Sequence, residues 1–140
     1  MNPQDLLRTH IIASTETALL KLAGELDMAT APLVDQAVAD CLAGGIRRLN
    51  IDLAAVTFCD AAGLGALERA NRASAAHCTV FRLAGMHRRL RRTFALHRAG
   101  SLIAPAMTDL ARLRVTAQRA TDDRVGTSTH AWASRICPAP

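Results

Sequence analysis

The order of the apolar segments limits most strongly how this chain can fold, because strand-like runs alternate with helix-like ones. Short apolar runs of the kind that form strands occur at residues 10–14, 18–25, 47–53, 79–83 and 102–104. Apolar residues at helical spacing occur in the segments 30–43, 60–76, 86–97 and 107–120. Only Thr15, Glu16 and Thr17 separate the first two runs, so these runs predict a β-hairpin.

Polar and small residues mark where the first two helices begin and end. Thr30 can cap the first helix with its side chain, and Pro32 is tolerated in a first helical turn. Gly44 and Gly45 can end this helix, because glycine adopts a left-handed conformation without a Cβ clash. Asp60 precedes the second helix and is expected to cap its free N–H groups.

Strands that alternate with helices predict parallel strand pairs joined by right-handed crossovers. The leading hairpin adds an antiparallel pair, so we expect an α/β fold with a mixed β-sheet flanked by about four helices. The 140 residues suit a single domain, which we place at residues 9–120. Residues 121–140 are polar, end in Pro-Ala-Pro and are expected to form a disordered C-terminal tail.

The positive charge of the chain is concentrated in one short segment. Its net charge is +5, yet residues 1–81 carry more acidic than basic groups, whereas residues 82–100 hold six arginines and no acid. Four of these arginines avoid the apolar stripe of the expected third helix: Arg88, Arg89, Arg91 and Arg92. They form either a contact for an acidic partner, an anionic membrane or nucleic acid, or an ordinary solvated helix face.

No arrangement of residues in the sequence predicts catalysis. The five histidines lack metal-ligand spacing, and no serine stands in a G-x-S-x-G context. Neither a P-loop nor a G-x-G-x-x-G motif is present. We therefore expect a protein that is not an enzyme and that holds no metal and no cofactor.

The cysteines and the N-terminus favour a cytoplasmic location. None of the four cysteines forms a C-x-x-C pair, and Cys41, Cys59 and Cys78 lie within apolar segments. We expect these three to be buried free thiols in a reducing compartment. No run reaches the ~18 apolar residues of a membrane span, and the first residues do not resemble a signal peptide.

Three stretches together resemble the STAS domain family (sulfate transporter and anti-sigma factor antagonist). Residues 22–32 are similar to the family's G-x-L-D followed by a helix start, and residues 49–53 form an L-N-I-D-L strand. Residues 56–65 are similar to the family's V-x-x-hydrophobic-D-S-[SA]-G-L motif. The order of elements also matches, from about residue 10 to about residue 120.

The resemblance implies a protein-binding module. In the best-known branch of the family, the domain binds an anti-sigma factor, usually a serine kinase, and thereby releases a sigma factor. The kinase reverses this by phosphorylating a serine in the D-S-x-G-L motif. The partner-binding residues that the resemblance implies are Asp27, Thr30, Asp60, Ala61, Ala62, Gly63 and Leu64.

The chain departs from the family's pattern at the phosphorylation site. The residue after Asp60 is Ala61 in place of serine, and Ala62 follows, so the D-A-A-G-L segment at residues 60–64 contains no hydroxyl group. Residue 61 is expected at the first helical position, where a phosphate would add about −1.5 to −2 charge. The resemblance therefore implies an antagonist that is not regulated by phosphorylation at this position.

Two other interpretations stay open at this point. The chain could be a STAS module that acts as a subunit of another complex, such as a lipid-transport assembly or a stress-signalling scaffold. It could instead bind nucleic acid through the basic helix, although no DNA-binding motif accompanies it and aromatic residues make up only 3% of the chain. Asp60 could also be an ordinary helix cap without any partner.

Overall fold

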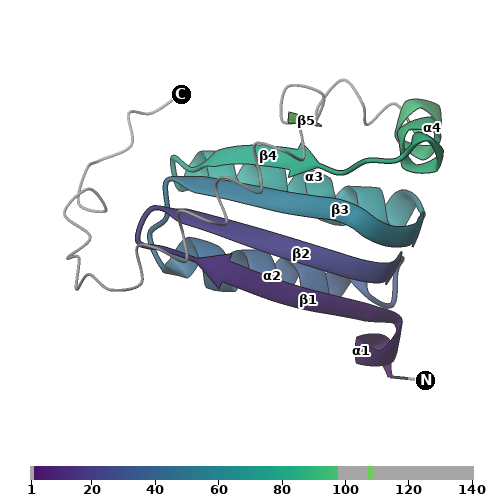
Figure 1. Cartoon of the computed structure of the whole chain (residues 1–140), viewed down its shortest axis with the longest axis horizontal. Coiled ribbons are helices and arrows are strands. Elements are labelled where there is room, and N and C mark those ends of the chain that lie inside the picture. The colour runs from purple at the N-terminus through teal and green to yellow at the C-terminus, as the bar shows by residue number, and fades with distance from the viewer. Residues whose placement is uncertain (1, 98–106, 109–140) are drawn as a thin grey trace.

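The computed structural model describes residues 2–97 and 107–108, which form one mixed sheet with helices packed against it (Figure 1). The strands among these residues are β1 (Leu7–Ala13), β2 (Thr17–Leu26), β3 (Arg48–Cys59), β4 (Val80–Ala84) and β5 (Met107–Thr108). The helices among them are α1 (Pro3–Leu6), α2 (Ala31–Ala43), α3 (Ala61–Ala76) and α4 (Arg88–Leu96). The strands lie in the order β1-β2-β3-β4-β5, with β1 antiparallel to β2 and every other pair parallel. The predicted single α/β domain with a leading hairpin and a mixed sheet is thus confirmed.

Alternating side chains along β2 and β3 place the main core on one face of the sheet. The buried residues of these strands in this core include Ala18, Leu20, Leu22, Leu49, Ile51 and Leu53. They pack with the apolar sides of α2 and α3, which contribute Val34, Val38, Leu42, Leu64 and Leu67. Figure 1 shows both helices on this one side of the sheet.

Helix α4 lies at the end of the sheet to which β3 and β4 point (Figure 1). Its predicted apolar stripe is buried, since Met86, Leu90 and Phe94 all belong to the main core. The helix starts at Arg88, two residues later than the pattern predicted, because His87 still has an extended backbone with ψ 168°. A short helix is thus held in place by two large side chains on one side.

The expectation of about four flanking helices is wrong by one for the described residues. Three helices of more than one turn are present there, α2, α3 and α4, and α1 is a single turn. The fourth helix was expected to start at residue 107, but Met107 and Thr108 form β5 and pair with Leu83 and Ala84. Pairing with the edge of β4 outweighs the local helical spacing. The expected strand at 102–104, the rest of the last helix and the tail lie outside the described residues.

Strand β3 is longer than the pattern predicted. It continues past residue 53 to Cys59 and stays paired with β2, with irregularities in register around Leu22 and between Gly24 and Glu25. Its pairing with β4 stops at Asp52. Residues 53–59 of β3 therefore extend beyond β4, toward the start of α3.

Two of the three cysteines expected in the core are there. Cys41 and Cys59 are buried free thiols. The expectation of a buried free thiol is wrong for Cys78, which is exposed and disulfide-bonded. It lies in the turn between α3 and β4, where its φ of 56° is left-handed. In the described part of the chain, no helix combines the length and the apolar character that crossing a membrane would require.

Helix α3 lies in close contact with the sheet at Gly63. A Cβ atom at this position would clash with the carbonyl oxygen of Leu26, and it would lie 2.8 Å from Leu26 Cγ and 2.9 Å from Cys59 Sγ. Gly65, one half-turn further, is different, because a Cβ there would meet only the flexible end of Arg69 at 3.3 Å. The missing side chain at Gly63 therefore sets how near α3 lies to β2 and β3.

Removing a large side chain from the middle of the sheet should destabilise the domain. Leu83 of β4 is fully buried, so Leu83→Ala should lower the free energy of unfolding by about 3 kcal/mol. Val80 on the same strand is 45% exposed, so Val80→Ala should cost under about 1 kcal/mol. Urea unfolding followed by circular dichroism measures both values. Equal costs would contradict the placement of Leu83 in the core.

Two glycines of α3 should respond oppositely to alanine. Gly65→Ala should be neutral or should stabilise the fold by up to ~1 kcal/mol, because alanine has the higher helix propensity. Gly63→Ala should destabilise it by about 2 kcal/mol despite the same propensity gain, because the added methyl group overpacks the contact with Leu26. The same unfolding experiment measures the two variants side by side, and a stabilised Gly63→Ala variant would refute the close approach.

Candidate functional site

Strands β2 and β3 run parallel and end together, so the segments that follow them lie at one edge of the sheet. Leu26, the last residue of β2, is paired with Cys59, the last residue of β3. The N–H of Asp60 donates to the carbonyl oxygen of Leu26 at 3.2 Å. The loop at residues 27–30 and the start of α3 therefore meet, and the two groups of predicted site residues come together.

Asp60 caps helix α3, as the sequence predicted. Its backbone is extended, with φ −104° and ψ −172°, and its carboxylate accepts a hydrogen bond from the N–H of Gly63 at 2.9 Å. The N–H of Leu64 donates to the carbonyl oxygen of Asp60 at 3.0 Å, which closes the first helical turn. The negative charge also faces the positive end of the helix dipole. The cap fixes where α3 begins.

The loop before α2 is organised by Asp27 and not by a Thr30 cap. The Asp27 Oδ1 atom accepts from the N–H groups of Ala29 at 2.9 Å and Thr30 at 3.0 Å. The hydroxyl of Thr30 makes no cap of α2, which corrects the prediction. It donates instead to the carbonyl oxygen of Glu25 at 2.8 Å and accepts from the N–H of Asp27 at 2.9 Å. Thr30 is fully buried, so its role is to tie the loop to the end of β2.

The five motif residues differ in how far they reach solvent. Ala61 is exposed, and Asp60 and Ala62 are half-buried. Gly63 and Leu64 are buried against the core of their own chain. A partner that docks here would therefore meet Ala61 first, whereas Gly63 and Leu64 hold the helix under it.

Two apolar side chains that the sequence analysis did not single out lie at the same edge. Met28 in the loop is 78% exposed, and Phe58 near the end of β3 is 50% exposed. Each is within two residues of the pair Leu26 and Cys59, where the two strands end. Large exposed apolar side chains are informative when they gather with others. Regular alternation would place Phe58 on the same face as the buried Val56, so the sequence pattern gave no signal for its exposure. The register shift between Gly24 and Glu25 interrupts the alternation at this point.

The thiol of Cys59 lies directly beneath the motif and does not ionise near neutral pH. Burial, and to a smaller extent the nearby negative charge of Asp60, together raise the pKa of this thiol to about 12. The Sγ atom lies 3.5 Å from the carbonyl oxygen of Asp60. A thiol that stays protonated is a poor nucleophile and a poor metal ligand. Cys59 is therefore a packing residue at this site.

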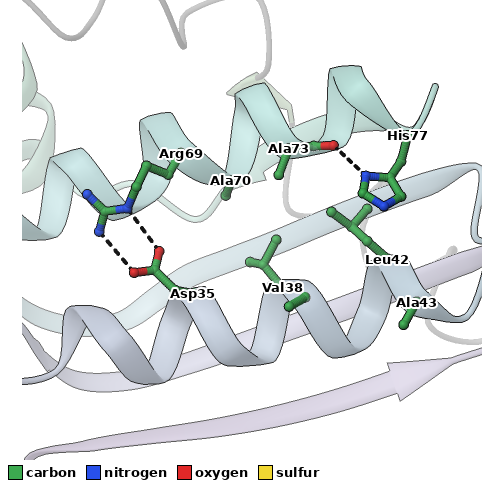
Figure 2. Close-up of a pocket in the computed structure, with 9 residues that line it drawn as sticks. Asp35, Val38, Leu42, Ala43, Arg69, Ala70, Ala73 and His77 are labelled. Atoms are coloured by element: carbon green, nitrogen blue, oxygen red, sulfur yellow. Dashed lines mark hydrogen bonds and ion pairs between the residues drawn. The ribbon is translucent and has the colours of Figure 1, made fainter.

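A shallow groove of about 400 Å³ runs between α2 and α3 on the outer side of the helices. Figure 2 shows Val38, Leu42 and Ala70 along it, with an ion pair at one end and His77 at the other. The ion pair is bidentate, because Arg69 Nε and Nη2 each donate to a different carboxylate oxygen of Asp35 at 3.1 Å. It joins the two helices across the groove, and none of the predicted site residues lines this groove.

The predicted basic residues Arg88, Arg89, Arg91 and Arg92 are all exposed on α4. Arg91 donates from Nε to the carbonyl oxygen of Met86 at 3.2 Å. His87 joins the start of α4 to β3 through a contact of 2.9 Å between its Nε2 atom and the carbonyl oxygen of Val56. Among residues 2–97 and 107–108, no three His, Cys, Asp or Glu side chains are grouped as metal ligands would be.

Several solved structures have a similar fold, although their sequence identity to this chain is low. An anti-sigma factor antagonist from Mycobacterium paratuberculosis superposes with a TM-score of 0.67 at 24% identity, covering 81% of this chain and 96% of that one. The Bacillus cell fate determinant SpoIIAA, in its phosphorylated form, gives a TM-score of 0.61 at 18% identity, with 79% and 98% covered. A sulfate transporter family protein from Wolinella succinogenes gives 0.61 at 15% identity, with 76% and 88% covered.

Sequence comparison assigns the family. No curated protein sequence matches the chain significantly. The family model of the STAS domain, in contrast, matches residues 9–112, which is most of the chain and includes both loops of the site. The chain therefore belongs to the STAS domain family.

Proposed function

We propose that this chain is an anti-sigma factor antagonist, which binds a kinase-like anti-sigma factor and thereby releases a sigma factor. The observation that carries the proposal is the exposed Ala61 beside Asp60, at the point where the loop after β2 and the start of α3 meet. The similarity of the fold to an anti-sigma factor antagonist from Mycobacterium paratuberculosis and to SpoIIAA supports it.

The partner surface is formed by the exposed residues of this edge, and the buried ones hold them in place. Met28, Phe58 and Ala61 offer apolar area to a partner. Asp27 and Thr30 fix the loop that carries Met28 through hydrogen bonds of 2.8–3.0 Å. Asp60, with Ala62, Gly63 and Leu64, fixes the helix turn that carries Ala61. An apolar centre framed by polar groups is typical of protein–protein contacts.

The absence of a hydroxyl group from residues 60–64 makes the antagonist insensitive to phosphorylation at residue 61. Ala61 and Ala62 offer no oxygen to which a kinase could transfer a phosphoryl group. The surface at residue 61 therefore stays small and neutral whatever the activity of the partner kinase.

The alternative is a STAS module that serves as a subunit of another complex. A sulfate transporter family protein from Wolinella succinogenes has a similar fold, so the fold alone does not separate the two functions. The partner separates them. Affinity purification of the tagged chain from the cells that produce it, read by mass spectrometry, should recover a kinase-like anti-sigma factor, whereas recovery of transporter or scaffold subunits would favour the alternative.

A negative charge at residue 61 should break the complex without unfolding the domain. Ala61→Asp should weaken binding to the recovered anti-sigma factor by about 100-fold, because a docked partner would bury an unpaired carboxylate. The same charge at a helix N-terminus is favourable for the free protein, so its melting temperature should not fall. Calorimetric titration and thermal unfolding measure the two effects. The control is Ala39→Asp on the exposed side of α2, which should bind the anti-sigma factor like the wild type. Unaltered binding by Ala61→Asp would place the interface elsewhere.

A serine at residue 61 should create the missing switch. Ala61→Ser keeps a small neutral side chain, so it should bind the anti-sigma factor as tightly as the wild type without ATP. With ATP and Mg²⁺, the variant should gain one phosphate at residue 61 and dissociate, since a phosphate adds about −1.5 to −2 charge. The wild type should stay bound and unmodified. Intact-protein mass spectrometry checks both, and a wild type that is phosphorylated and released would contradict the constitutive role.

A further inference from the structure

The exposed side of α4 carries positive charge that the described part of the chain does not neutralise. Arg88, Arg89 and Arg92 are exposed, and their side chains make no ion pair or hydrogen bond with residues 2–97 or 107–108. The helix itself contains no acid. Like charges one turn apart, such as Arg88 and Arg92, weaken a helix, so its own stability does not account for this arrangement.

A hollow lies beside this helix on the part of β3 that extends beyond β4. Its volume is about 430 Å³, and its lining consists of Ala54, Ala55, Val56, Thr57, His87 and Arg89. Ala54 and Ala55 leave the hollow wide because their side chains are small. The contact between His87 Nε2 and the carbonyl oxygen of Val56 fixes the start of α4 against the strand, so Arg89 stands at the rim of the hollow.

The geometry of α4 adds a second arginine on the same side. Residues three apart are neighbours on a helix surface, so Arg92 follows Arg89 along α4. The lining of the hollow ends at Thr57, and the next residue of β3 is Phe58, which belongs to the surface proposed for the anti-sigma factor. A charged rim next to an apolar centre is the usual layout of a protein interface.

Two other anionic ligands, a membrane surface and single-stranded nucleic acid, fit α4 and its surroundings poorly. A helix that lies on a membrane inserts its apolar face into the lipid, but Leu90 and Phe94 are each only 2% exposed because they pack in the core. Single-stranded nucleic acid requires exposed aromatic side chains for stacking. Among residues 2–97 and 107–108, Phe58 is the only exposed Phe, Tyr or Trp, and His87 adds one imidazole ring at the hollow, so no row of stacking rings is present.

We propose that Arg89 and Arg92, together with the hollow along β3, bind an acidic, extended segment of a partner protein. The segment lies over Ala54 and Ala55, and its carboxylates pair with the two guanidinium groups. In the cell this partner is the anti-sigma factor, so that part of the inference rests on the proposed function. The arginines accelerate association and select an acidic partner, whereas Met28, Phe58 and Ala61 supply the apolar contact.

A peptide titration tests the charge requirement without knowledge of the partner. The probe is a fluorescein-labelled peptide of alternating Glu and Ala, about ten residues long, which spans the hollow when extended. Fluorescence anisotropy at low salt should detect binding to the full chain, weakened about ten-fold or more in Arg89→Gln/Arg92→Gln. The matched control Arg48→Gln/Arg72→Gln changes the net charge equally at exposed sites outside the hollow and should bind like the wild type.

A second variant tests the hollow separately from the charges. Ala55→Phe on the exposed part of β3 fills the hollow while all arginines stay, so it should also weaken peptide binding several-fold. Circular dichroism confirms that each variant is folded. No peptide binding by the wild type, or equal binding by Arg89→Gln/Arg92→Gln, would overturn the proposal. The proposal would also be overturned if a DNA duplex or vesicles containing phosphatidylserine bound more tightly than the peptide and Arg89→Gln/Arg92→Gln lost that binding. The arginines of α4 would then be assigned to that ligand.

The two proposals can fail independently. In one outcome, affinity purification recovers an anti-sigma factor equally well with the wild type and with Arg89→Gln/Arg92→Gln, at both low and raised salt. The acidic-segment proposal is then wrong, and the antagonist function stands. If no anti-sigma factor is recovered but the peptide binds in the arginine-dependent manner described, the antagonist function fails and the acidic-segment site stands.

Discussion

The parallel pairing of β2 with β3 is the constraint on which the site depends. Because Leu26 and Cys59 are register partners, the strands end together, and the N–H of Asp60 reaches the carbonyl oxygen of Leu26. Two loops more than thirty residues apart in sequence thereby become one surface. Each loop is then fixed by a carboxylate: Asp27 accepts two backbone N–H groups before α2, and Asp60 accepts one in the first turn of α3. A slip of the register by one residue would turn the side chains of a strand to the other face and separate the loops.

The motif has a structural part and an exposed part, and they have different physical roles. Gly63 and Leu64 face the core, and the absent side chain of Gly63 lets α3 lie against Leu26 and Cys59. Ala61 is held outward by this packing and by the cap. The side chain at residue 61 therefore lies at the surface, outside the packing that holds α3 against the sheet.

The carboxyl end of the sheet combines two kinds of surface. Met28, Phe58 and Ala61 form its apolar part, and Arg89 of α4 lies beside residues 54–57 of β3. Apolar contacts supply most of the binding free energy of a protein complex, whereas exposed charges mainly set the rate of association and the choice of partner.

The sequence by itself determined the α/β class, the hairpin, the cap at Asp60 and the positions of α2 and α3, because these follow from hydrophobic period and from local cap chemistry. It also determined that position 61 has no hydroxyl group. Tertiary structure alone decided that Met107 and Thr108 pair as a strand, that β3 continues to Cys59 and that Thr30 bonds Glu25 and not the helix start. It alone also brought Met28 and Phe58 to the edge with Ala61. These features arise from pairing between distant segments, and the local pattern of residues does not encode which segments meet.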